Sequence, residues 1–122
     1  MTDRKEIIRT YKQRVAPMGI FQVRNTENGK ILVDKSKALD TKYNSILFQL
    51  KMGSFPNKEL QEDFLKYGEA VFVYEVLDRL EPKDDPLYNY DDDLKTLEQL
   101  WLEKLQPYGE KGYNRKRPTK ET

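Results

Sequence analysis

The chain has 122 residues, of which 35% are charged and 37% apolar, and its formal net charge is +1. This length is typical of one domain with one core, and no run approaches the roughly 18 consecutive apolar residues of a membrane-spanning helix. Cysteine and histidine are both absent, which excludes disulfides, thiolate metal sites and imidazole bases and favours a cytoplasmic protein.

The first half of the chain predicts a helix, a β-hairpin and two further helices. The first helix should end near residue 15, because Pro17 disfavours helical geometry in the residue before it. Residues 18–25 and 30–34 are β-prone runs on either side of Asn28-Gly29, a pair that is typical of a type I′ hairpin turn. Two helices should follow, at residues 39–52 and 57–68.

The second half predicts one strand and one long helix. Residues 70–77 are almost continuously apolar, which favours a central strand covered on both faces. An acidic, proline-containing loop at residues 81–90 precedes a helix from residue 91 to about residue 105.

The order of these elements, α-β-β-α-α-β-α, predicts an α+β fold with a small three-stranded, mainly antiparallel sheet flanked by helices. Residues 1–114 should form this single domain, and residues 115–122 should form a basic, disordered tail.

One acidic residue, Glu98, falls on the apolar side of the last predicted helix, between Leu105 and Leu102 on the helical wheel. A carboxylate on a buried stripe is unfavourable unless it meets a cation, hydrogen-bond donors or a metal. Two interpretations remain open. Glu98 is a metal ligand or acid at the floor of a cleft, or it is a structural carboxylate paired with a Lys or Arg from the basic half of the chain.

Positive charge is concentrated in the first part of the chain. Residues 1–52 hold 11 Lys and Arg against 5 Asp and Glu, whereas residues 53–122 hold 11 against 16. A basic half suits a polyanionic partner such as nucleic acid, but a solvated surface with segregated charges gives the same counts.

Several short motifs occur in a defined order along the chain. They are Gly19-Ile20-Phe21, Ile31-Leu32-Val33, Lys42, Glu98 and Gly112-Tyr113-Asn114. Over about residues 17–114 they resemble the motifs of the GIY-YIG nuclease superfamily, whose members cut nucleic acid with a single divalent metal. The resemblance implies the α+β fold expected above, Glu98 as the ligand of Mg²⁺ or Mn²⁺, and Asn114 as a structural support of the site.

The reactive side chains of that family are largely replaced in this chain. The resemblance implies tyrosines at the positions of Phe21 and Ile31, which are therefore vestigial, and an arginine where Lys42 stands. Phenylalanine has no hydroxyl with which to orient water, and lysine keeps the positive charge without the bidentate fork of arginine. Lys42 and Glu98 are the remaining candidate catalytic residues.

We therefore expect a GIY-YIG nuclease-like domain that binds DNA or RNA and is catalytically impaired or inactive. Its expected nucleic-acid contacts are Lys30, Lys35, Lys37, Lys42, Arg115 and Arg117. Tyr88 and Tyr90, in the predicted loop, are candidates for stacking on bases or on a protein. Two alternatives stay open: an active, divergent metal-dependent DNA endonuclease that uses Glu98, and a protein-interaction module that has kept only the scaffold.

Overall fold

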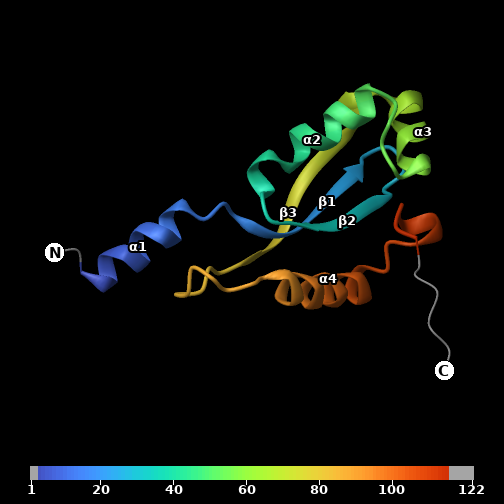
Figure 1. Cartoon of the computed structure of the whole chain (residues 1–122). Helices are drawn as coiled ribbons and strands as arrows, with labels where there is room; N and C mark the ends of the chain where they lie inside the picture. The colour runs from blue at the N-terminus through green and yellow to red at the C-terminus, as the bar shows by residue number, and fades with distance from the viewer. Residues whose placement is uncertain (1–2, 116–122) are drawn as a thin grey trace.

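The computed structural model describes residues 3–115, except the side chains of Tyr11 and Gln13. Its elements in chain order are α1 (Arg4–Arg14), β1 (Met18–Asn25), β2 (Ile31–Ser36), α2 (Leu39–Lys51), α3 (Lys58–Tyr67), β3 (Phe72–Leu80) and α4 (Asp91–Leu105), with short 3-10 turns at Glu69–Val71 and Gly109–Lys111. This is the predicted order of helices and strands, and the fold is α+β (Figure 1).

The sheet has the strand order β2-β1-β3, and both neighbouring pairs are antiparallel. The prediction of a central strand at residues 70–77 is therefore wrong, because β3 lies at an edge and its Val76 is 37% exposed. The central strand is β1, where Ile20, Phe21 and Val23 have no exposed surface. An apolar run reports burial of side chains but not the presence of a strand on each side, so it cannot separate a covered edge strand from a central one.

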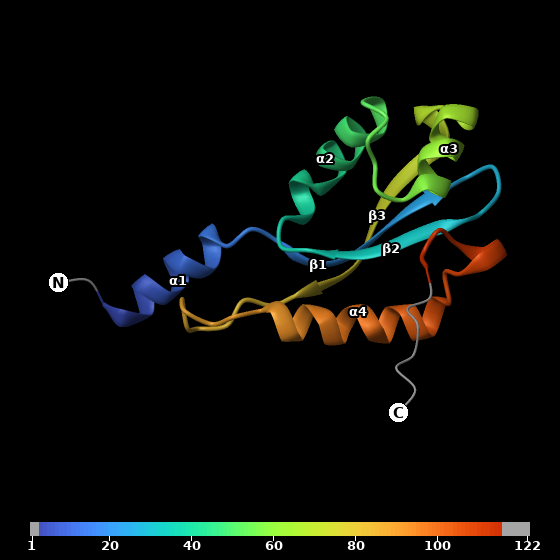
Figure 2. The ribbon, with the colours of Figure 1, turned by 45° about the vertical axis from the view of Figure 1, so that its right-hand side comes forward.

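Helices cover the two faces of the sheet unequally. Figures 1 and 2 show α2 and α3 over one face and α4 along the other, while α1 extends away from the sheet. The larger core lies under α2 and α3, and a smaller one joins Met18 and Leu94 with Tyr90. Tyr90 is only 8% exposed, so the prediction that it is available for stacking is wrong.

Within residues 3–115, no helix has the length and apolar character needed to cross a membrane.

The hairpin between β1 and β2 is present, but its turn differs from the predicted one. Gly29 has a φ of 77°, whereas Asn28 does not have the positive φ that a type I′ turn requires. The side chain of Asn25 shapes the loop instead, because its Oδ1 accepts from the Glu27 N–H at 2.8 Å. The Gly29 N–H also donates to the Asn25 carbonyl oxygen at 2.8 Å, so this backbone bond and the Asn25 side chain close the loop without a type I′ turn.

Gly19 allows β1 to approach β3 closely, next to a register shift between Ile20 and Phe21. A Cβ atom at Gly19 would lie 2.0 Å from the carbonyl oxygen of Asp78, which leaves no room for any side chain. The first motif of the sequence therefore has a packing reason for its glycine.

The end of the described chain adds to the free edge of β2. Gly112 forms a parallel bridge with Ile31, and the Tyr113 N–H donates to the Ile31 carbonyl oxygen at 2.8 Å. A Cβ atom at Gly112 would lie 2.3 Å from the Pro107 carbonyl oxygen, so this segment also needs glycine to pass. The edge of β2 is thereby covered at the level of Ile31.

Candidate functional site

Glu98 lies on the side of α4 that faces the sheet, and it is 5% exposed. Its Oε1 accepts a hydrogen bond from the Lys35 Nζ of β2 at 3.1 Å. Burial raises the pKa of Glu98, Lys35 acts in the opposite direction, and the neighbouring Asp34 carboxyl group raises the pKa further. The buried position predicted from the helical wheel is therefore present, and its partner is a lysine from the basic half of the chain.

Asp34 is a residue that the sequence analysis missed. It follows the Ile31-Leu32-Val33 motif directly on β2, and it lines the same cleft as Glu98. Its Oδ1 accepts the Lys35 backbone N–H at 2.8 Å. Two carboxyl groups, one from the sheet edge and one from α4, thus lie next to one another with a single lysine.

We call the hollow beside these two residues the carboxylate cleft. It has a volume of about 780 Å³ and lies between β2, the start of α3, α4 and the segment that follows α4. Its lining residues are Leu32, Val33, Asp34, Pro56, Asn57, Glu98, Gln99, Leu102, Glu103, Gln106, Tyr108, Asn114 and Arg115.

Asn114 contacts the wall of the carboxylate cleft through its side-chain amide. Its Nδ2 donates to the Val33 carbonyl oxygen and its Oδ1 accepts the Val33 N–H, both at 2.8 Å. The Asn114 amide therefore pairs with the backbone of Val33 as a residue of a neighbouring strand would, and it fixes the backbone of β2 immediately before Asp34. Its role as a structural support of a functional site stays a prediction.

A second hollow, which we call the lysine pocket, lies at the start of α2 and α4. It has a volume of about 560 Å³ and is lined by Lys35, Ser36, Lys37, Lys42, Asp91, Asp92, Leu94 and Lys95. Lys37 is paired with Asp91, whereas Lys42 and Lys95 form no ion pair with any residue in the range 3–115. Lys35 lines the lysine pocket, and its ammonium group contacts Glu98, which lines the carboxylate cleft.

The two predicted catalytic residues line different hollows, Glu98 the carboxylate cleft and Lys42 the lysine pocket. The vestigial positions do not line either hollow. Phe21 has no exposed surface and its ring packs 5.2 Å from that of Tyr74, and Ile31 is bound to the Tyr113 segment. Arg115 lines the carboxylate cleft, whereas Arg117 and the rest of the predicted tail lie outside the described residues.

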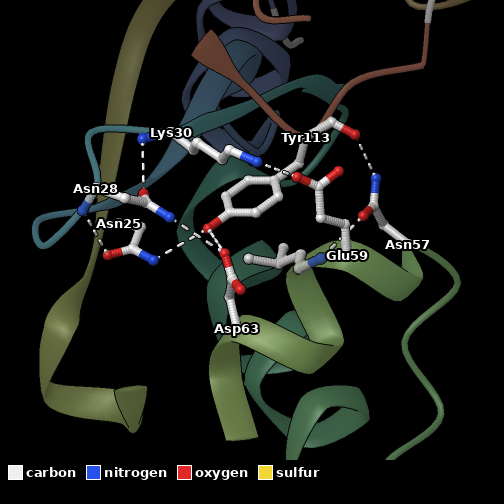
Figure 3. Close-up of polar contacts among 8 residues, drawn as sticks. Asn25, Asn28, Lys30, Asn57, Glu59, Asp63 and Tyr113 are labelled. Carbon is white, nitrogen blue, oxygen red and sulfur yellow. Dashed lines mark hydrogen bonds and ion pairs between the residues drawn. The ribbon is translucent and has the colours of Figure 1, made fainter. Parts of the chain in front are cut away.

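The remaining predicted contact, Lys30, belongs to a polar cluster elsewhere in the molecule. We call this cluster the Tyr113 network (Figure 3), and its members are Asn25, Asn28, Lys30, Asn57, Glu59, Asp63 and Tyr113. The Tyr113 hydroxyl donates to Asp63 Oδ2 at 2.7 Å, and Asn25 Nδ2 donates to the Tyr113 hydroxyl at 3.1 Å. Burial and Asp63 both raise the pKa of Tyr113.

The Tyr113 network fixes the segment that carries Asn114 and Arg115. Lys30 forms an ion pair with Glu59, and its ammonium group lies over the Tyr113 ring, so its positive charge already has partners within the protein. Asn57 has two roles: its Oδ1 accepts the Leu60 N–H at the start of α3, and its Nδ2 donates to the Tyr113 carbonyl oxygen at 2.7 Å. The sequence predicts a helix that begins at residue 57, but it gives no signal for the contact between Asn57 and a residue 56 positions away.

No protein-family model matches this chain, and a search of curated proteins gives no match. Two solved structures are similar to it. A glutamate-to-alanine mutant of the catalytic domain of intron endonuclease I-TevI has a TM-score of 0.63 and 24% sequence identity over 74% of this chain and 84% of that one. The catalytic domain of homing endonuclease I-TevI has a TM-score of 0.62 and 26% identity over 73% of this chain and 88% of that one. The fold of this chain is therefore GIY-YIG-like, as the motifs predicted.

Proposed function

We propose that this GIY-YIG-like domain binds nucleic acid at the lysine pocket and does not hydrolyse it. The observation that carries the proposal is the convergence of Lys35, Lys37, Lys42 and Lys95 on one hollow beside the carboxylate cleft. Two of these lysines, Lys42 and Lys95, have no acidic partner within residues 3–115 and can each take a phosphate. The solved structures with the same fold are catalytic domains of endonucleases, which favours nucleic acid among the possible polyanions.

Three observations argue against hydrolysis. The position of the first family tyrosine is Phe21, which has no hydroxyl and is enclosed in the core. The candidate arginine position is Lys42, which lines a different hollow from Glu98. The chain has no histidine that could act as a base.

The resemblance also implies a divalent metal at Glu98, and the donor set does not fit one as it is arranged. Oε1 of Glu98 already accepts from Lys35. Among residues 3–115, no group of three or more Asp, Glu, His or Cys side chains is placed to hold a metal ion. Binding of nucleic acid should therefore persist in EDTA.

The test is a fluorescence-anisotropy titration of labelled single-stranded and double-stranded DNA and RNA in EDTA, at several salt concentrations. For the nucleic acid that binds, log affinity should fall linearly with log salt. The double variant Lys42→Ala/Lys95→Ala should bind more weakly, with a salt slope smaller by about 2 because each lost phosphate contact removes roughly 1.

The matched control is Lys5→Ala/Lys66→Ala, which removes the same charge from exposed lysines outside both hollows. It should bind as the parent protein does. Equal weakening by both double variants would show that the lysine pocket is not the binding site. Cutting of DNA in Mg²⁺ or Mn²⁺ that Glu98→Ala abolishes would overturn the claim that the domain is inactive, and would favour the divergent endonuclease.

A protein-binding role is the second candidate, and two exposed apolar residues favour it. Phe48 and Met52 lie one turn apart at the end of α2 and are 66% and 67% exposed. Large apolar side chains in such positions are common at protein contacts. Tight retention of a protein that Phe48→Ser/Met52→Ser abolishes, without binding of any nucleic acid, would support this role instead.

A further inference from the structure

Glu98 is a buried carboxylate, and Lys35 is its ion-pair partner. Glu98 is 5% exposed, so its ionised form has lost almost all contact with water and requires a positive partner nearby. Lys35 Nζ, at 3.1 Å from Oε1, is that partner.

Lys35 approaches Glu98 from the solvent side. Its side chain is 36% exposed, whereas that of Glu98 is 7% exposed. The ammonium group therefore occupies the space beside Oε1 of Glu98 that a cation bound to this oxygen would need.

The local charges are incompletely balanced, because Asp34 neighbours Glu98 and the one ion pair that either carboxylate forms within residues 3–115 is that of Glu98 with Lys35. Without the Lys35 ammonium group, two carboxylates would lie side by side next to the water-accessible carboxylate cleft. Mg²⁺ is commonly bound through one or two carboxylates, with water filling the other positions. With the ammonium group in place, a divalent cation at the same carboxylates would face a positive charge at contact distance, which is strongly unfavourable.

We propose that the Lys35 ammonium group takes the place of a divalent cation beside Asp34 and Glu98, so that this carboxylate pair is a latent metal site that Lys35 keeps closed. The proposal is independent of nucleic-acid binding, which is measured separately in EDTA.

The test measures Mn²⁺ binding by the electron paramagnetic resonance signal of free Mn²⁺. The proteins compared are the parent, Lys35→Met, Lys35→Met/Glu98→Gln and the matched control Lys66→Met, which removes an exposed lysine outside both hollows. We expect Lys35→Met to bind one Mn²⁺ at least about tenfold more tightly than the parent, because the repulsion is gone. Lys66→Met should match the parent, and the added Glu98→Gln change should remove the new binding.

Two results would overturn the proposal: parent protein that binds Mn²⁺ as tightly as Lys35→Met, or folded Lys35→Met that binds none. If circular dichroism shows that Lys35→Met does not fold, Lys35→Gln is compared with the parent instead, because glutamine removes the charge and keeps a polar side chain. Tighter Mn²⁺ binding by Lys35→Gln than by the parent upholds a closed site, and equal binding refutes it.

Discussion

Replacing Tyr113 by phenylalanine would remove one hydroxyl group from the Tyr113 network and leave the aromatic ring in place. The hydroxyl donates to Asp63 Oδ2 at 2.7 Å and accepts from Asn25 Nδ2 at 3.1 Å. Asn25 has no exposed surface, so its amide group would lose its partner in a place that water does not reach. We expect the free energy of unfolding to fall by about 1–3 kcal/mol, the penalty typical of a buried unsatisfied donor.

Thermal unfolding followed by circular dichroism at pH 7 measures this loss. A fall of this size lowers the Tm of a domain of this length by roughly 4 to 12 °C. The matched control is Tyr43→Phe, because the Tyr43 hydroxyl lies 3.5 Å from its acceptor, the Phe72 carbonyl oxygen, and contributes little. A Tm for Tyr113→Phe equal to that of the parent, or an equal loss in Tyr43→Phe, would refute the reasoning.

The effect of Tyr113→Phe should also depend on pH. Burial and Asp63 raise the pKa of Tyr113 above its ordinary value of 10.0, so the folded protein favours the neutral hydroxyl. A group whose pKa is raised on folding contributes stability in full below its unfolded pKa and loses that contribution as pH rises through the folded pKa. The difference in stability between the parent and Tyr113→Phe should therefore be constant up to about pH 9 and narrow in more alkaline solution.

Two further predictions concern Gly19 and Glu98. Gly19→Ala places a Cβ atom 2.0 Å from the Asp78 carbonyl oxygen. Urea denaturation should therefore show a loss of more than about 2 kcal/mol in the free energy of unfolding, larger than the loss in Gly53→Ala, where the added atom meets open space. Equal losses in the two variants would contradict the close approach of β1 and β3. Burial raises the pKa of Glu98 above its ordinary value of 4.5. The stability of the parent relative to Glu98→Gln should therefore be greatest in acid and fall as the pH rises above that ordinary value, and a difference that does not change with pH would exclude the raised pKa.

The position of Glu98 could be predicted from the sequence because burial on a helix is a local property. The spacing of Leu94, Trp101 and Leu105 defines the inner side of α4 without reference to any other element. The partner of Glu98 could not be predicted in the same way, because the choice among the lysines of the first half depends on how α4 lies against β2. That arrangement places Lys35, and no other lysine within residues 3–115, in an ion pair with Glu98.

Pairings between distant segments account for the other differences. β3 lies at an edge because β1 pairs with both other strands. The apolar run at residues 70–77 indicates a strand but does not indicate which strands pair with it. Asp34 could not be predicted as a cleft residue, because it lies outside the Ile31-Leu32-Val33 motif that precedes it and the sequence does not distinguish it from other acidic residues. The Tyr113 network joins the hairpin, α3 and the last described segment, and its polar residues resemble ordinary loop and helix-surface residues in the sequence.

The bond between Asn114 and Val33 joins residues that are 81 positions apart. During synthesis, β1, β2 and α2 leave the ribosome long before their last partner does, since translation proceeds at roughly 5–20 residues per second. Until residue 114 emerges, the outer edge of β2 and the amide of Asn25 lack the groups that satisfy them in the finished domain. The nascent chain therefore passes through a stage with an open strand edge that can pair with another chain, and a ribosome stalled before residue 114 holds the protein in that aggregation-prone form.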